Sequence, residues 1–372
     1  MPAPLNILLA PLDWGLGHAT RCIPLVRYLL GQQCRVTLAA EGATAILLKS
    51  NFPQLTIVPI PGYHIRYSHS ARVMPLKIMM QIPKILRAIR AERLWLQKIQ
   101  KQNQFDLIIS DNRYGLKIKN VHSVILTHQL LIKTGAGSIF DQILRRLHYR
   151  ILEKFDACWV VDEECENSIG GELSHPETIP VNARYIGILS QLEPRASSSI
   201  STSGEILVLL SGPEPQRSLL EKIVLDQITP DAAHHFIIVG GKPQGAAPEN
   251  LPDGAVYYTH RNASQLADLI DKAELVICRS GYSTLMDLAF MEKKALLIPT
   301  PGQSEQSYLA DYLRRQGLFH SCGQNVLSLE NDLKKALAYP GFPKNSGRVS
   351  MDNMKAAVQS MLAELSTNLT KY

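Results

Sequence analysis

The chain has 372 residues, of which 45% are hydrophobic and 19% are charged. Its length exceeds what one hydrophobic core usually supports, so we predict two domains, and its ordinary globular composition excludes an intrinsically disordered protein. The 39 Lys and Arg outnumber the 33 Asp and Glu, giving a formal charge of +6. That charge suits an anionic ligand or membrane surface, but without a recognition helix or zinc finger we expect no nucleic acid partner.

The six cysteines are scattered without a C-x-x-C pair, so the sequence predicts no metal site and no cofactor. The first residues lack a basic segment, and their apolar run is too short to cross a bilayer. Several cysteines lie in apolar runs, as reduced core cysteines do. These features predict a cytoplasmic protein.

The chain begins with a strand, a glycine-rich loop and a helix. An apolar strand over 5–10 leads into the loop Asp13-Trp14-Gly15-Leu16-Gly17-His18, and apolar residues then recur at helical spacing. The glycines let a ligand approach the backbone, and histidine titrates where a general base works. We therefore expect Gly15 and Gly17 beside the acceptor or a phosphate and His18 as a catalytic base; a capping or surface histidine is the alternative.

Strands and helices alternate through the rest of the first half. We predict further strands over 35–40, 55–60, 105–110, 121–126 and 157–161, the last being the final buried strand of this half. This alternation indicates a parallel, doubly wound sheet.

Polar residues follow two of these strands where each one ends. Asp111 and Asn112 come after one strand, and His128 comes after the next. Because ligands bind at the carboxyl ends of strands in such sheets, we expect these side chains to share a crevice with His18. Ordinary polar loop residues are the alternative.

A long amphipathic helix is predicted over 74–102, kinked or split at Pro83. Its apolar positions are flanked by lysines and arginines, and Glu92 is its one acidic residue. Such a helix could lie on an anionic membrane surface, and the segment 143–150 has the same basic character. A domain helix with a solvated basic face explains the pattern as well.

The Ser-rich stretch 191–204 has the composition of a flexible linker. It separates a first domain, 1–190, from a second domain, 205–345, and a last helix over 346–372 would pack back on the first domain. The second domain again alternates helices with strands, predicted over 205–210, 235–239, 255–258, 275–277 and 295–299.

The segment Cys278-Arg279-Ser280-Gly281-Tyr282-Ser283-Thr284 follows a buried strand and opens a helix. Unpaired N–H groups at a helix N-terminus favour a phosphate, so we predict an anion site built by Arg279, Ser280, Gly281, Ser283 and Thr284. Asp287 shares the face of Thr284, where a carboxylate beside a phosphate suits a ribose diol. A plain strand–turn–helix, with Ser283 or Thr284 as a cap, is the alternative.

These residues resemble glycosyltransferase family 28, which includes lipid-linked N-acetylglucosaminyltransferases of bacterial peptidoglycan synthesis. The resemblance covers 205–318, is most specific in 278–287 and 299–306, and reaches the first half mainly through 15–18. It implies the type B glycosyltransferase fold, in which two Rossmann-like domains face each other across a cleft. It also implies that the first domain binds the acceptor and the second binds the donor UDP-sugar.

The resemblance assigns roles to several residues of the second domain. It implies that Asp287 holds the ribose, that the loop of Arg261 and Asn262 touches uracil, and that Gln306, with Gln303 nearby, reaches the donor sugar. Asp287 and Ser307 replace a glutamate and a glutamine of the family pattern. The loop that contains Ser211 and Gly212, expected near the diphosphate, is poorer in glycine, and its two prolines lack N–H groups.

The sequence therefore predicts an inverting hexosyltransferase that moves a hexose or N-acetylhexosamine from a UDP-sugar to an acceptor hydroxyl, with a membrane lipid as one candidate acceptor. Either His18 or Asp111 takes the acceptor proton, and Arg279 with the helix N-terminus stabilises the leaving UDP. Two alternatives stay open. The run 17–22 is similar to nucleotide-sugar hydrolases of nonulosonic acid synthesis, and a nucleotide-sugar-binding protein without turnover fits the proline-substituted loop.

Overall fold

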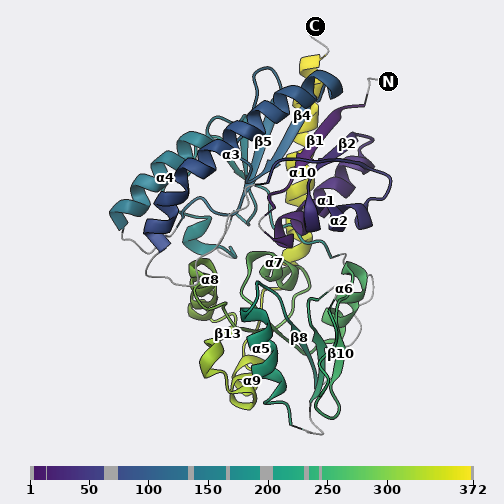
Figure 1. Ribbon diagram of the computed structural model, residues 1–372, viewed down its shortest axis with the longest axis vertical. Coiled ribbons are helices and arrows are strands. Elements are labelled where there is room, and N and C mark those ends of the chain that lie inside the picture. Colours follow the sequence, from purple (N-terminus) through teal and green to yellow (C-terminus); the bar gives the residue numbers. More distant parts are fainter. Residues whose placement is uncertain are drawn as a thin grey trace. The chain divides into compact units, whose positions relative to one another are not determined.

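The computed structural model describes residues 4–13, 15–62, 74–132, 138–164, 168–192, 204–229, 234–242 and 245–369. The chain divides into two compact units, Met1–Gln191 with Val349–Tyr372, and Leu192–Arg348. Each unit is a parallel sheet with helices packed around it (Figure 1). Most of the predicted linker lies outside the described residues.

The first unit contains a seven-stranded sheet in the order β3-β2-β1-β4-β5-β6-β7. Its strands pair in parallel throughout, and the central ones are buried on both faces, as their apolar sequences require. The strands are β1 (Asn6–Ala10), β2 (Arg35–Ala39), β3 (Thr56–Val58), β4 (Leu107–Asp111), β5 (His122–Thr127), β6 (Ala157–Val160) and β7 (Ala183–Tyr185).

One further strand of this unit was not predicted: the three-residue β7, too short to show a pattern, pairs with β6. It is only partly buried, so 157–161 contains the last buried strand, as expected. Of the two outcomes expected at Pro83, the split does not occur, because α3 runs from Met74 to Asn103 with the proline inside it. The other helical segments are α1 (Leu16–Gly31), α2 (Gly42–Asn51), α4 (Ser138–Leu152) and η2 (Gly171–Leu173).

The second unit contains a six-stranded parallel sheet in the order β10-β9-β8-β11-β12-β13. Its core is formed by aliphatic residues of these strands and of the flanking helices. The strands are β8 (Glu205–Leu209), β9 (His235–Val239), β10 (Val256–Tyr258), β11 (Leu275–Cys278), β12 (Ala295–Leu297) and β13 (His320–Ser321), the last of which the sequence did not indicate. The helical segments are α5 (Gln216–Leu225), α6 (Ala263–Lys272), α7 (Tyr282–Phe290), α8 (Ser304–Arg315), η3 (Gln324–Val326) and α9 (Leu329–Leu337).

The last helix, α10 (Ser346–Leu369), contributes most of its length to the first unit. The Ile188 N–H donates to Ser350 Oγ at 3.1 Å, and Asn353 Nδ2 donates to Glu163 Oε2 at 3.1 Å. A side chain at Gly187 would come within 2.7 Å of the Ser350 carbonyl. The helix therefore packs on the segments that follow β6 and β7. Among the described helices, none has the length and apolarity needed to cross a bilayer.

Candidate functional site

Each sheet has one point where the strand order reverses direction, and the candidate residues lie there. In the first unit this point lies between β1 and β4, and in the second unit between β8 and β11. Open parallel sheets bind ligands at such switch points, outside the carboxyl ends of the strands. His18 and Asp111 lie at the first point, and Gly212 and the start of α7 lie at the second.

His18 and Asp111 form a buried pair in the first unit. Asp111 is the last residue of β4, which pairs with β1, and His18 lies in the first turn of the helix after β1. His18 Nδ1 lies 3.0 Å from Asp111 Oδ2, and the two side chains are 14% and 1% exposed. The pair leaves Nε2 as the imidazole nitrogen available to a substrate.

Arg21, which the sequence did not single out, completes this pair. Its guanidinium holds the Asp111 carboxylate with two nitrogens, Nε at 3.0 Å from Oδ2 and Nη2 on Oδ1. Nη2 also lies 2.9 Å from His18 Nδ1, and Nη1 donates to His128 Nδ1 at 2.7 Å. Arg21 lies one helical turn after His18, so this spacing was the available signal.

The charges in this cluster favour a neutral imidazole and an ionised carboxylate. Burial lowers the pKa of His18 below its ordinary 6.5, although the Asp111 charge acts in the opposite direction. Burial alone would raise the pKa of Asp111, but the charges of Arg21 and His18 outweigh it and hold that pKa below its ordinary range. A neutral histidine beside a fixed carboxylate is the arrangement that general bases use.

The tautomer of His18 decides what the cluster can do. If Nδ1 carries the proton, it donates to Asp111 and Nε2 can accept a proton from a substrate. If instead Nδ1 accepts from Arg21, Nε2 carries the proton and cannot act as a base. The ionised carboxylate at 3.0 Å favours the first tautomer.

The other predicted residues of the first unit are close in sequence to members of this cluster or belong to it. Asn112 has a left-handed backbone (φ 53°) directly after β4, and His128, only 7% exposed, follows β5. Gly15 precedes α1 with φ 91°, a conformation that favours glycine, and nothing lies within 4 Å of a Cβ built there. Gly17 lies in α1, where its carbonyl accepts from Thr20 Oγ1.

In the second unit, α7 presents three of the predicted residues on one half-exposed face. Ser283, Thr284 and Asp287 are partly exposed, whereas Tyr282, Leu285, Met286, Leu288, Ala289 and Phe290 are buried. Gly281 precedes the helix without a side-chain cap. The first turn of α7 and Asp287 thus share the face that the anion and ribose prediction requires.

Gln306 joins the loop before α7 to the loop after β12. Its carbonyl accepts from Ser280 Oγ at 2.8 Å, and its side-chain Oε1 accepts from the Thr300 N–H at 2.8 Å. Its Nε2 lies 3.8 Å from a Cβ built at Gly281. Gln306 therefore lies at the start of α7, with its carboxamide oxygen already bonded to the protein.

Thr300 is a second residue that the sequence did not single out. Its side chain is 2% exposed, and its Oγ1 has no hydrogen-bond partner among the described residues. This oxygen lies 3.7 Å from a Cβ built at Gly212, after β8. A buried hydroxyl without a partner is costly, so Thr300 is a candidate ligand contact at this switch point.

Two of the predicted donor-binding side chains have hydrogen-bond partners within the protein. The Arg279 guanidinium, 1% exposed, donates to carbonyls of Gln216, Ile298 and Pro299 and to Gln324 Oε1, so it braces loops instead of facing a phosphate. The Ser280 hydroxyl is buried on Gln306. These partners are far away in sequence, so local spacing could not reveal them.

The remaining predicted residues of this unit lie in more open positions. Asn262 caps α6 through a reciprocal pair with Gln265, so its side chain serves the helix. The Arg261 guanidinium stacks 3.4 Å from the Tyr258 ring centroid. Gln303 precedes α8, and Ser211 and Gly212 are exposed after β8, with Gly212 at φ 99°.

Comparison with known proteins agrees with this architecture. Residues 216–362 match the glycosyltransferase family 28 C-terminal domain. Over 293 residues, 74% of each chain, the protein is 24% identical to the UDP-N-acetylglucosamine--N-acetylmuramyl-(pentapeptide) pyrophosphoryl-undecaprenol N-acetylglucosamine transferase of Burkholderia pseudomallei (strain 1710b).

Two solved structures share the fold of the whole chain. The glycotransferase of kitacinnamycin gives a TM-score of 0.71 at 13% identity, covering 98% of this chain and 100% of its own. The spinosyn rhamnosyltransferase SpnG, complexed with thymidine diphosphate, gives 0.65 at 14% identity, covering 96% and 100%.

Proposed function

We propose that this chain, whose residues 216–362 match the glycosyltransferase family 28 C-terminal domain and whose fold is type B, transfers a hexose or N-acetylhexosamine from a UDP-sugar to an acceptor hydroxyl with inversion. The observation that carries this proposal is the His18–Asp111 pair, whose carboxylate lies 3.0 Å from the imidazole. A histidine held in this way by an ionised carboxylate is equipped to deprotonate a hydroxyl.

In the proposed reaction, Nε2 of neutral His18 takes the proton of the acceptor hydroxyl. The oxygen of that hydroxyl bonds to the anomeric carbon as the bond between this carbon and the diphosphate oxygen breaks, and UDP leaves with the bonding electrons. Asp111 stabilises the imidazolium that forms. Arg21 keeps Asp111 ionised, so it positions the base without contacting the substrate.

The donor site of the proposal is the start of α7. Its first-turn N–H groups and the Ser283 and Thr284 side chains would receive the diphosphate, since a helix N-terminus favours anions. Asp287 would accept hydrogen bonds from the ribose hydroxyls. UDP as the nucleotide is supported by the curated relative, whose name specifies UDP-N-acetylglucosamine.

A panel of UDP-sugars tests the proposal, with each sugar incubated with and without a lipid extract and the products analysed by mass spectrometry. Transfer predicts that UDP release depends on the extract and that a glycosylated product appears. UDP release at the same rate without acceptor would favour the nucleotide-sugar hydrolase. Donor binding without consumption under every condition would favour a binding protein.

A lipid-linked acceptor, and a location on the inner face of the membrane, are supported by the exposed face of α3. Leu86 and Leu94 are each 59% exposed among exposed cations, while Glu92, the one acid of the helix, is buried on Arg113. On α4, Ile143 and Leu147 are 53% and 50% exposed. Exposed apolar side chains set among cations suit the surface of an anionic bilayer.

Co-sedimentation with phosphatidylglycerol vesicles tests this membrane contact. The double substitution Leu86→Gln and Leu94→Gln should reduce the bound fraction, because it removes apolar contacts and leaves the charge unchanged. The matched control is Ile46→Gln with Val326→Gln, which alters side chains that are 72% and 75% exposed on other elements. Equal binding of the two double variants would contradict the contact.

A further inference from the structure

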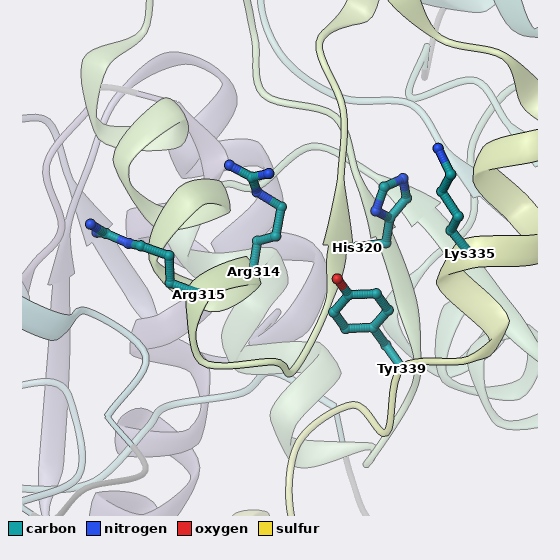
Figure 2. Close-up of a pocket in the computed structure, with 5 residues that line it drawn as sticks. All are labelled: Arg314, Arg315, His320, Lys335 and Tyr339. Carbon is teal, nitrogen blue, oxygen red and sulfur yellow. The ribbon is translucent and has the colours of Figure 1, made fainter.

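A basic cavity lies in the second unit, away from the residues assigned above. Its volume is about 460 Å³, and its lining comes from α8, β13 and the end of α9: Arg314, Arg315, His320, Lys335 and Tyr339. Figure 2 shows the Arg314 guanidinium and the Lys335 ammonium on either side of the His320 ring, with the Tyr339 hydroxyl directed toward the space between them.

The cavity lies at the amino-terminal end of a strand, whereas α7 starts at the carboxyl-terminal end of one. Arg314 and Arg315 end α8 just before β13, and His320 is the first residue of that strand. Lys335 lies in the last turn of α9. These residues therefore gather at the amino end of β13, whereas α7 starts at the carboxyl end of β11. A ligand in this cavity would be separate from the donor.

The nearby acids do not neutralise the cavity. Asp332 accepts from His320 Nε2 at 2.8 Å and lies 4.0 Å from the Lys335 ammonium, and Asp311 lies 3.3 Å from the Arg314 guanidinium. Arg315 has no acidic partner among the described residues. The lining thus contains two arginines and one lysine, and two carboxylates lie nearby. The net charge of this group is therefore positive.

Basic residues at helix C-termini stabilise the helix ends, but that role does not require two helices to bring them to one cavity. Here guanidinium, ammonium, imidazole and phenol groups converge from three elements. Arginine matches phosphate oxygens with paired N–H groups, and Lys and Tyr add further donors. A volume of 460 Å³ falls within the range of small-molecule sites.

The geometry points to a second anion site in this unit, which binds the phosphate or pyrophosphate group of a ligand other than the sugar donor. The cavity would accept a free phosphorylated small molecule or the headgroup of an anionic lipid, because both present the same oxygens. This site does not depend on the proposed transfer reaction.

Calorimetry with inorganic pyrophosphate tests the site, with saturating UDP present so that the donor site cannot contribute. The double substitution Arg314→Gln and Lys335→Gln removes two cations from the cavity. The matched control, Arg348→Gln with Lys334→Gln, removes the same charges from exposed positions outside the lining. Thermal melting should show that both variants fold.

We expect wild type and control to bind pyrophosphate and the cavity variant to bind at least about tenfold more weakly. Co-sedimentation with phosphatidylglycerol vesicles separates the two sources. If only vesicle retention depends on the cavity residues, the ligand is a headgroup; if pyrophosphate binding depends on them, it is a free phosphate compound. Equal losses in both double variants, or no cavity-dependent binding in either assay, would overturn the site.

Discussion

His18 Nδ1 lies 3.0 Å from Asp111 Oδ2, although 93 residues separate them in the chain. The strand order explains this contact, because β1 and β4 are neighbours, Asp111 ends β4, and His18 lies in the first turn of the helix after β1. Arg21 Nη2 lies 2.9 Å from the same imidazole nitrogen. A carboxylate at position 111 therefore favours the proton on Nδ1, whereas a donor at that position would favour the proton on Nε2.

Asp111→Asn should reduce kcat by about 10²–10⁴, because a neutral amide can donate to Nδ1 and leave the proton on Nε2. His18→Gln should lose as much, and the double variant no more than either single one, because the two residues act as a unit. His235→Ala, which removes an exposed histidine of β9, is the control. Additive losses in the double variant would contradict this coupling.

Asp111→Asn should also lower the free energy of unfolding by about 3–5 kcal/mol, because it leaves the buried Arg21 guanidinium without its carboxylate. His18→Gln should cost much less, since it removes no buried charge. Urea unfolding at pH 7 measures both values. Kinetic assays must therefore be run where Asp111→Asn is folded.

The pH profile of kcat/KM should have an acid limb whose apparent pKa lies below 6.5. Burial lowers the pKa of His18, and the base must be neutral to accept a proton, so activity falls as the pH drops through this lowered pKa. In His18→Gln the limb should vanish from the residual activity. An unchanged limb in that variant would assign the base to another residue.

Asp287→Ala should raise the KM for the UDP-sugar about 10–100-fold, the range expected when charged hydrogen bonds to the ribose are lost, and change kcat little. A 2′-deoxyuridine diphosphate sugar provides the sharper comparison. Wild type should discriminate against it, whereas Asp287→Ala should treat both donors alike. Asp311→Ala on α8 removes an exposed carboxylate as the control. Undiminished discrimination in Asp287→Ala would remove this residue from the ribose contact.

Thr300→Val should weaken donor binding about tenfold while leaving the unliganded protein as stable or more stable. The substitution removes a buried hydroxyl that has no partner among the described residues, and such groups cost about 1–3 kcal/mol. Thr300→Ser keeps the hydroxyl and should keep donor affinity. Calorimetry with UDP and urea unfolding separate the two effects, and unchanged UDP affinity in Thr300→Val would argue against the contact.

Glu163→Gln should be more stable than wild type by a larger margin at pH 8 than at pH 5. Burial and the Asp162 charge raise the pKa of Glu163 to about 7, so the folded state holds a proton that the unfolded state has released. Stability is therefore lost as the pH rises from about 4.3 to about 7. The stability of Glu163→Gln relative to wild type should increase by about 2–3 kcal/mol between pH 5 and pH 8.

The exposed neighbour Glu164 provides the control, since Glu164→Gln should show no such gain. His148 acts in the opposite direction, because burial lowers its pKa to about 4 and stability rises with pH between about 4 and 6.5. Its effect is present in wild type and variant alike, so it cancels in the comparison. An equal gain for both glutamine variants would contradict the role of Glu163 burial.

The fold class was predictable from the sequence because it rests on short-range signals. Apolar runs separated by helical periodicity indicated parallel sheets, and the structure has two of them. The rule that ligands bind at the carboxyl ends of strands brought His18, Asp111 and His128 together correctly. The strands β7 and β13 were missed because two or three residues carry no periodicity.

What the sequence determined by itself was the order of the elements and the edge of each sheet at which polar residues gather. Only the tertiary structure decided which of these residues remain available to a ligand: Arg279 and Ser280 are committed to the protein, and Thr300 keeps a hydroxyl without a partner among the described residues. Periodicity is a local property of the chain, whereas a hydrogen-bond partner tens of residues away depends on which strands become neighbours.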